Sequence, residues 1–207
     1  MTIHIFGGGT IQHVRNHLAL CAPAYGSTAR KLAAELENSP LNMAVKLHLT
    51  KMADPASKME TNEDVSRVLG GLLSSADTRA VIFNVAMCDF SGQIDGIVSG
   101  KYAERLKTRD ADSVHMALAP TPKVLASIKI ARPDVFVVGF KTTAGATEIE
   151  QKTAAERQIH ETGVDLVFAN DTVTRNNMLV DRKGYRLRGS REEVLEMLAL
   201  TLQVTLK

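Results

Sequence analysis

Three short apolar runs constrain the fold of this chain more than any other feature of its sequence. They cover Ala80–Ala86, Asp134–Phe140 and Val164–Ala169, and polar or turn-forming residues flank each of them. Continuous apolar runs of this length are typical of strands that are covered on both faces, as in parallel sheets. Segments with helical periodicity separate the runs, so the pattern predicts parallel strands joined by right-handed crossovers.

Weaker local signals complete an α/β pattern. Thr2–Phe6 predicts a first strand that ends in a tight turn at Gly7–Gly9, and Ser27 and Ser190 are expected to cap the first and last helices. The other expected features are a strand over Met43–Leu49, a capping box at Thr61–Asp64, a helix with Pro122 in its first turn, a helix over Thr147–Glu161 and a hairpin turn at Lys183 and Gly184. We therefore expect a Rossmann-like three-layer fold with a mainly parallel central sheet.

One long polar stretch does not fit the regular alternation. It runs from Asp89 to about Asp112, which is too long for an ordinary connection in a small α/β domain. Such loops are usually functional or mobile, so we expect a long flap-like loop here. No Pro/Gly/Ser-rich linker divides the 207 residues, and we expect one domain over residues 1–207.

Composition excludes several classes of protein. The formal net charge is +2 and the basic residues are dispersed, which argues against a nucleic acid partner. Two isolated cysteines, Cys21 and Cys88, favour a reducing compartment over a disulfide framework or a zinc site. No apolar run approaches the roughly 20 residues of a membrane span, and the first residues do not resemble a signal peptide. These features predict a cytoplasmic protein without a membrane partner.

Two groups of residues point to a phosphate-bearing ligand, although each has an ordinary structural explanation. The backbone amides of Gly8, Gly9 and Thr10 could approach an anion, or the glycines could only form a turn. Asp89 follows the most apolar strand, where its carboxylate could bind a ribose, a base or a divalent cation, or simply cap a turn. No residues complete a metal site around His13 and His17, so we predict none held by the protein alone.

Basic residues crowd the expected flap. Lys101, Arg105, Lys107 and Arg109 could close over phosphates and stabilise negative charge in a transition state. They could equally be the solvated surface of a basic loop. Cys21 has no basic neighbour in the sequence, so covalent cysteine catalysis is not expected.

Several segments, taken in chain order, resemble the phosphopantothenate-cysteine ligase family, which forms the carboxyl-terminal half of many bifunctional coenzyme A flavoproteins. The segments are Ile5–Thr10, Asn84–Phe90, Glu104–Thr108, Pro120–Leu125, Val137–Thr143 and Asp165–Asp171. The resemblance implies activation of the 4′-phosphopantothenate carboxylate by CTP or ATP with Mg²⁺. The cysteine amine then attacks the acyl-nucleotidylate. It also implies a homodimer and leaves the choice of CTP or ATP open.

The same resemblance assigns roles to residues of this chain. Lys107 or Arg105 would be the catalytic flap cation that offsets charge as pyrophosphate leaves. The implied nucleotide-binding residues are Phe83, Asn84, Val85, Asp89, Thr121, Pro122, Lys123, Val124 and Phe140, together with Gly8, Gly9 and Thr10. The implied substrate-binding residues are Tyr25, Gly26 and Asn170.

The chain departs from the family at two elements that carry chemistry. The Ser-Asn-x-Ser-Ser-Gly element corresponds to Cys21–Gly26, and two lysines of a late helix fall at Gln158 and Thr162. A second hypothesis is therefore a nucleotide- or pantetheine-binding regulator that has lost ligase chemistry. A nicotinamide-dependent oxidoreductase is a third, disfavoured because the glycines lack GxGxxG spacing and no strong Tyr-x-x-x-Lys pair follows.

Overall fold

A seven-stranded sheet forms the centre of the computed structural model, which describes residues 1–39, 43–109 and 112–206. The strand order is β11-β10-β9-β8-β5-β1-β4. Five strands are parallel: β1 (Thr2–Gly9), β4 (Ala44–Leu49), β5 (Thr78–Ala86), β8 (Phe136–Thr143) and β9 (Leu166–Asp171). The other two, β10 (Asn177–Asp181) and β11 (Gly184–Gly189), continue the sheet in antiparallel register. The predicted α/β fold with a mainly parallel sheet is confirmed.

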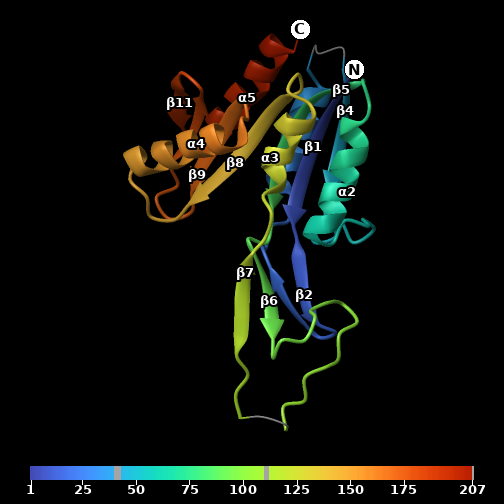
Figure 1. The fold of residues 1–207 in the computed structure, drawn as a ribbon. Coiled ribbons are helices and arrows are strands. Elements are labelled where there is room, and N and C mark those ends of the chain that lie inside the picture. The colour runs from blue at the N-terminus through green and yellow to red at the C-terminus, as the bar shows by residue number, and fades with distance from the viewer. Residues whose placement is uncertain (40–42, 110–111, 207) are drawn as a thin grey trace.

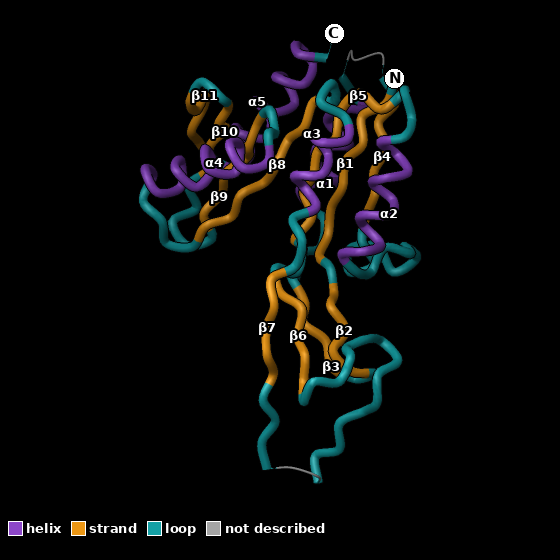
Figure 2. The backbone as a smooth tube through the Cα atoms, viewed as in Figure 1, coloured by secondary structure: helices purple, strands orange, loops and turns teal. Residues whose placement is uncertain are grey.

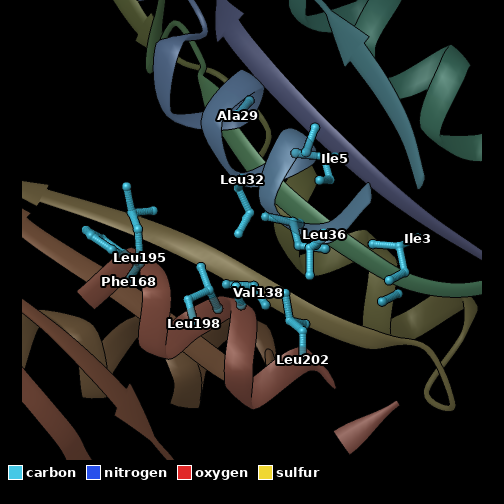
Figure 3. Close-up of a cluster of buried hydrophobic side chains, with 14 of the residues drawn as sticks. Ile3, Ile5, Ala29, Leu32, Leu36, Val138, Phe168, Leu195, Leu198 and Leu202 are labelled. Carbon is cyan, nitrogen blue, oxygen red and sulfur yellow. The ribbon is translucent and has the colours of Figure 1, made fainter. Parts of the chain in front are cut away.

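Helices cover both faces of the sheet and bury two apolar clusters. α1 (Ser27–Glu37) and α5 (Arg191–Thr205) pack on one face, and Figure 3 shows Leu32, Leu36, Leu198 and Leu202 meeting strand residues there. α2 (Asn62–Leu73), α3 (Val124–Ala131) and α4 (Glu148–Thr162) pack on the other face. These helices form because their apolar residues recur at helical spacing, and capping boxes at Thr61, Thr147 and Ser190 start three of them. In the described part of the chain, no helix is long and apolar enough to cross a membrane.

Two small sheets extend beyond the carboxyl edge of the main sheet (Figures 1 and 2). β2 (Ile11–Arg15) pairs with β3 (Leu18–Cys21), and β6 (Phe90–Ile94) pairs with β7 (Met116–Pro120), both in antiparallel register. We call these four strands, with the described loop residues 95–109 and 112–115 between β6 and β7, the arm. The predicted flap therefore begins with a regular strand, and its later described residues form a loop.

Three local predictions are wrong. The first is the turn at Gly7–Gly9: β1 continues through these residues, which pair with β5. The glycines are needed there because neighbouring segments pack closely against the strand. A side chain at Gly7 would place its Cβ 2.4 Å from the Cβ of Ala29 in α1. The N-cap of α1 is Gly26, in the left-handed conformation, and not Ser27. Pro122 precedes the N-cap of α3 and does not occupy its first turn.

Candidate functional site

The carboxyl edge of the sheet around β1 is the natural place for a ligand. β4 pairs with one side of β1 and β5 pairs with the other, so the order of the strands reverses at β1. In open α/β sheets the crevice beyond the strand ends at such a reversal is the usual binding site. The connections into the arm leave the sheet at this edge (Figure 1).

The glycine end of β1 lies inside the molecule. A Cβ on Gly8 would lie 2.1 Å from the Thr50 hydroxyl oxygen, and one on Gly9 would lie 1.9 Å from the Ala22 carbonyl oxygen. Thr10 is fully buried, and its hydroxyl donates to Asn62 Oδ1 at 2.6 Å. Close packing therefore accounts for Gly9, close packing and a φ of 104° account for Gly8, and a hydrogen bond accounts for Thr10. Their contact with an anion stays a prediction.

Asp89 lies at the same edge, between β5 and β6. Its exposed carboxylate pairs with the ammonium of Lys123, and its carbonyl oxygen accepts a hydrogen bond from Thr121 N at 2.9 Å. Pro122 lies between these two partners, and Val124 begins α3 and packs against the apolar cluster under that helix. The structure thus brings together five of the predicted nucleotide-binding residues.

The predicted pocket residues of β5 divide between the two faces of the sheet. Phe83 and Val85 face the cluster under α2, α3 and α4. Phe83 pairs with Gly139 of β8, so Asn84 and Phe140 are the next residues on the two strands and point to the opposite face. Asn84 Nδ2 is buried and has no hydrogen-bond partner among the described residues. Asn84 and Phe140 therefore lie on the face of the sheet that α1 and α5 cover, and the Asn84 amide there could still donate a hydrogen bond.

The predicted substrate-binding residues lie on two segments. Tyr25 is 71% exposed immediately before α1, and a Cβ on Gly26 would lie 3.7 Å from Gly8 N. Asn170 is near the end of β9, where its Oδ1 accepts from the Thr142 hydroxyl at 3.2 Å. Tyr25 and Gly26 thus border the end of β1, whereas Asn170 lies three strands away in the sheet.

The two predicted catalytic cations are not at the sheet edge of their own chain. Arg105 and Lys107 are exposed in the loop over residues 95–115. This loop starts only after the five residues of β6, so about 17 Å of strand separates its start from Asp89. Figure 2 shows the arm, which carries this loop, extending away from the main sheet.

Arg191, the first residue of α5, was not among the site residues predicted from the sequence. Its guanidinium lies 5.6 Å from the centre of the Phe168 ring, and Phe168 in turn stacks on Phe140. Arg191 Nη2 donates to the Thr28 hydroxyl at 2.6 Å, and burial holds the pKa of Arg191 below its ordinary value. The cap at Ser190 predicted the start of this helix, but its contact with Phe168 is seen only in the folded structure.

The thiols and histidines give no sign of covalent or metal chemistry. Burial raises the pKa of the Cys88 thiol, and a thiol with a raised pKa is a poor nucleophile. His13 lies 3.7 Å from a carboxylate oxygen of Glu60, a residue that also pairs with Lys101 of the arm loop. Across residues 1–39, 43–109 and 112–206, no three His, Cys, Asp or Glu side chains gather as a metal site would require.

Comparisons with known proteins agree with this architecture. The structure is similar to the DNA/pantothenate metabolism flavoprotein from Streptococcus pneumoniae, with a TM-score of 0.81 and 18% identity over 99% of both chains. It is also similar to the C-terminal domain of a coenzyme A biosynthesis bifunctional protein CoaBC, with a TM-score of 0.65, 15% identity and coverage of 99% and 95%. A Cab2 variant in complex with phosphopantothenate-cysteine gives a TM-score of 0.66, 15% identity and coverage of 99% and 86%. At these identities the likeness shows the fold.

Sequence similarity identifies the family. The coenzyme A biosynthesis bifunctional protein CoaBC of Thermococcus kodakarensis is 32% identical over 113 residues, which are 55% of this chain and 26% of that protein. The chain thus matches about a quarter of the length of this relative. The family model described as DNA/pantothenate metabolism flavoprotein C-terminal domain matches residues 41–199. Because this match covers most of its length, the chain belongs to the DNA/pantothenate metabolism flavoprotein C-terminal domain family.

Proposed function

We propose that this chain is a phosphopantothenate-cysteine ligase-like enzyme that acts in the cytoplasm as one unit over residues 1–207. It would activate the carboxylate of phosphopantothenate with CTP or ATP and join it to the amine of cysteine. The observation that carries this proposal is the meeting of Asp89, Thr121 and Lys123 at the carboxyl edge of the sheet, next to the strand at which the order reverses. Membership of a coenzyme A biosynthesis family supports it.

The residues at this edge suit a nucleotide. The ring of Phe140 offers an apolar face to a base, and the unpartnered Nδ2 of Asn84 can donate to a base carbonyl or ring nitrogen. Lys123 is an exposed cation that can approach a phosphate. The Asp89 carboxylate is the kind of ligand that Mg²⁺ uses together with phosphate oxygens, so Asp89 would hold the cation that accompanies the nucleotide.

The flap cations would act on the charge that develops as pyrophosphate leaves. Arg105 and Lys107 are exposed and form no ion pair with another described residue, so either side chain is available for a phosphate. Because no hydrogen bond or ion pair among the described residues joins either side chain to Asp89 or Lys123, they would reach the phosphates by movement of the loop or from the arm of a second copy. Their contribution would be electrostatic stabilisation and not proton transfer.

A second candidate is a nucleotide- or pantetheine-binding regulator without ligase activity. The segment Cys21–Gly26 offers no side-chain amide, and the Ala22 amide is already bonded to the Thr10 carbonyl oxygen. Gln158 and Thr162 of α4 are uncharged, where the family has two lysines. The Thr162 hydroxyl donates to the Gln158 carbonyl oxygen. These observations favour binding without turnover.

Pyrophosphate release separates the two candidates. We expect release with CTP or ATP, Mg²⁺, phosphopantothenate and cysteine, and none when any one component is omitted. Asp89→Asn should weaken nucleotide binding measured by calorimetry, and Lys107→Gln should slow turnover by about 100-fold with a smaller effect on binding. Lys183→Gln, in the turn between β10 and β11, is the control. Nucleotide binding without pyrophosphate release would support the regulator. If the protein showed no binding and no release, both candidates would be excluded.

We also propose a homodimer formed through the arm. β6 packs against the β2–β3 sheet, where Arg15 Nη2 donates to the Ile94 carbonyl oxygen at 2.7 Å, but Phe90 and Leu118 of β6 and β7 remain exposed. Ile97, Val98 and Tyr102 of the arm loop are also exposed. We expect sedimentation equilibrium to give twice the chain mass, and a double change of Phe90 and Leu118 to Ser should produce monomers. A monomeric parent protein would contradict this proposal.

A further inference from the structure

The chain crosses between the main sheet and the arm four times, and the crossings are bonded to one another. They lie at Thr10, Ala22, Cys88 and Thr121. Ala22 N donates to the Thr10 carbonyl oxygen at 3.0 Å, and Cys88 N donates to the Thr10 hydroxyl at 2.9 Å. The Thr121 hydroxyl donates to the Cys88 carbonyl oxygen at 2.6 Å. The base of the arm is thus one connected network of hydrogen bonds.

One member of this network belongs to the body and not to a crossing. Asn62 is the first residue of α2 and is only 5% exposed. Its Nδ2 donates to the Cys88 carbonyl oxygen at 2.8 Å, and its Oδ1 accepts from the Thr10 hydroxyl at 2.6 Å. The capping box between Thr61 and Asp64 fixes the first turn of α2, and therefore the position of this carboxamide. Its Nδ2 also reaches the Thr121 hydroxyl oxygen at 3.5 Å, so Asn62 joins three of the four crossings to a rigid element of the body.

The other bonds between this part of the body and the arm are fewer or weaker. Ile11 N donates to the Glu60 carbonyl oxygen at 3.0 Å, which fixes only the start of β2. The Glu60 carboxylate pairs with Lys101 at 2.6 Å, but the Lys101 side chain is 45% exposed, and solvent weakens such a pair. Without the Asn62 carboxamide, Cys88 N would still bond to Thr10 and the Cys88 carbonyl oxygen would still bond to Thr121. The arm would stay folded and lose its buried attachment to α2.

We propose that Asn62 is a positioning residue that fixes the direction of the arm relative to the carboxyl edge of the sheet. It sets where the loop with Arg105 and Lys107 lies relative to Asp89. The inference needs no bound ligand and no turnover, so it can be tested whether or not the chain is a ligase.

A distance between two spin labels measures the direction of the arm. We choose Val98→Cys in the arm loop and Ile149→Cys in the first turn of α4, because these side chains are 82% and 77% exposed. Cys21→Ser removes the exposed native thiol, and an excess of unlabelled protein suppresses distances between two copies. Double electron–electron resonance on the full chain should give one narrow distance distribution, and Asn62→Ala should at least double its width.

Two controls separate positioning from general loss of stability. Asn38→Ala removes an exposed asparagine at the end of α1, and Leu69→Ala creates a cavity under α2 without touching the network. Both should keep the narrow distribution. Asn62→Leu, which removes both polar atoms but keeps the volume, should broaden it as Asn62→Ala does. Three results would overturn the proposal. The first is a parent-like width in both Asn62 variants, and the second is equal broadening in Leu69→Ala. The third is loss of the folded body in both Asn62 variants.

Discussion

Replacing Asp171 by alanine is expected to lower the midpoint of thermal unfolding on the order of 10 °C. The carboxylate is buried at the end of β9 and accepts hydrogen bonds from the Thr143 hydroxyl and from backbone amides on two loops. The amide donors are Gly145, Ala146, Val173 and Thr174. Alanine would leave these donors without their acceptor at a buried position. A donor that is removed from water and has no partner destabilises the folded state by its desolvation cost. Differential scanning calorimetry measures the shift.

Asparagine at the same position and a pH series provide the controls. Burial alone would raise the pKa of Asp171, but bonds from Thr174 N, the Thr143 hydroxyl, Ala146 N and Gly145 N outweigh it and hold the pKa far below its usual value. A depressed pKa contributes stability above the unfolded-state value of about 3.9, and that stability is lost as the pH falls below it. Asp171→Asn should lie between the parent and Asp171→Ala, with less loss of stability below pH 4. A midpoint for Asp171→Ala within 2 °C of the parent would contradict the prediction.

The sequence predicted best the elements that depend on neighbouring residues. The apolar runs became β5, β8 and β9, and the capping signals at Thr61 and Ser190 started α2 and α5. In these cases the periodicity and the capping residue act within a few positions of each other, so a local pattern is sufficient.

The sequence did not predict the arm, and one of its two sheets, β6–β7, depends on distant pairs. Phe90 pairs with Pro120 across 30 positions, and the strand β6 has few apolar residues to mark it. A pattern search that works over neighbouring residues treats such a stretch as a loop, because the pairing that makes it a strand is not local. The predicted flap therefore had the right position along the chain but too little regular structure.

Candidate site residues were predictable where they follow a strand directly. Asp89 was identified because it comes after β5, and the structure places it at the sheet edge with Lys123. Asn62 and Arg191 were not identified, because each begins a helix and reaches its partners through the packing of distant elements. Thr10 was identified for its position after the glycines, but its buried hydrogen bonds also give it a structural role.

Gly9→Ala is expected to destabilise the protein by about 3 kcal/mol or more, the upper range for overpacking a buried site. The added Cβ would lie 1.9 Å from the Ala22 carbonyl oxygen and 2.7 Å from Ala24 N, and both are backbone atoms. A flexible side chain could rotate away, but these atoms can move only if the whole connection from β3 to α1 shifts. The free energy of unfolding in urea measures the loss.

Gly70→Ala in α2 is the matched control for this substitution. A Cβ at Gly70 would meet nothing within 4 Å, and alanine is favoured over glycine inside a helix by about 0.5–1 kcal/mol. The same chemical change should therefore stabilise the protein at Gly70 and destabilise it at Gly9. Because Gly9 is not in the left-handed region of backbone conformation, backbone strain cannot account for its loss, which the close approach of the Ala22 and Ala24 backbone explains. If both variants unfolded at the parent's urea concentration, close approach of the connection before α1 could not be the reason for glycine at this position.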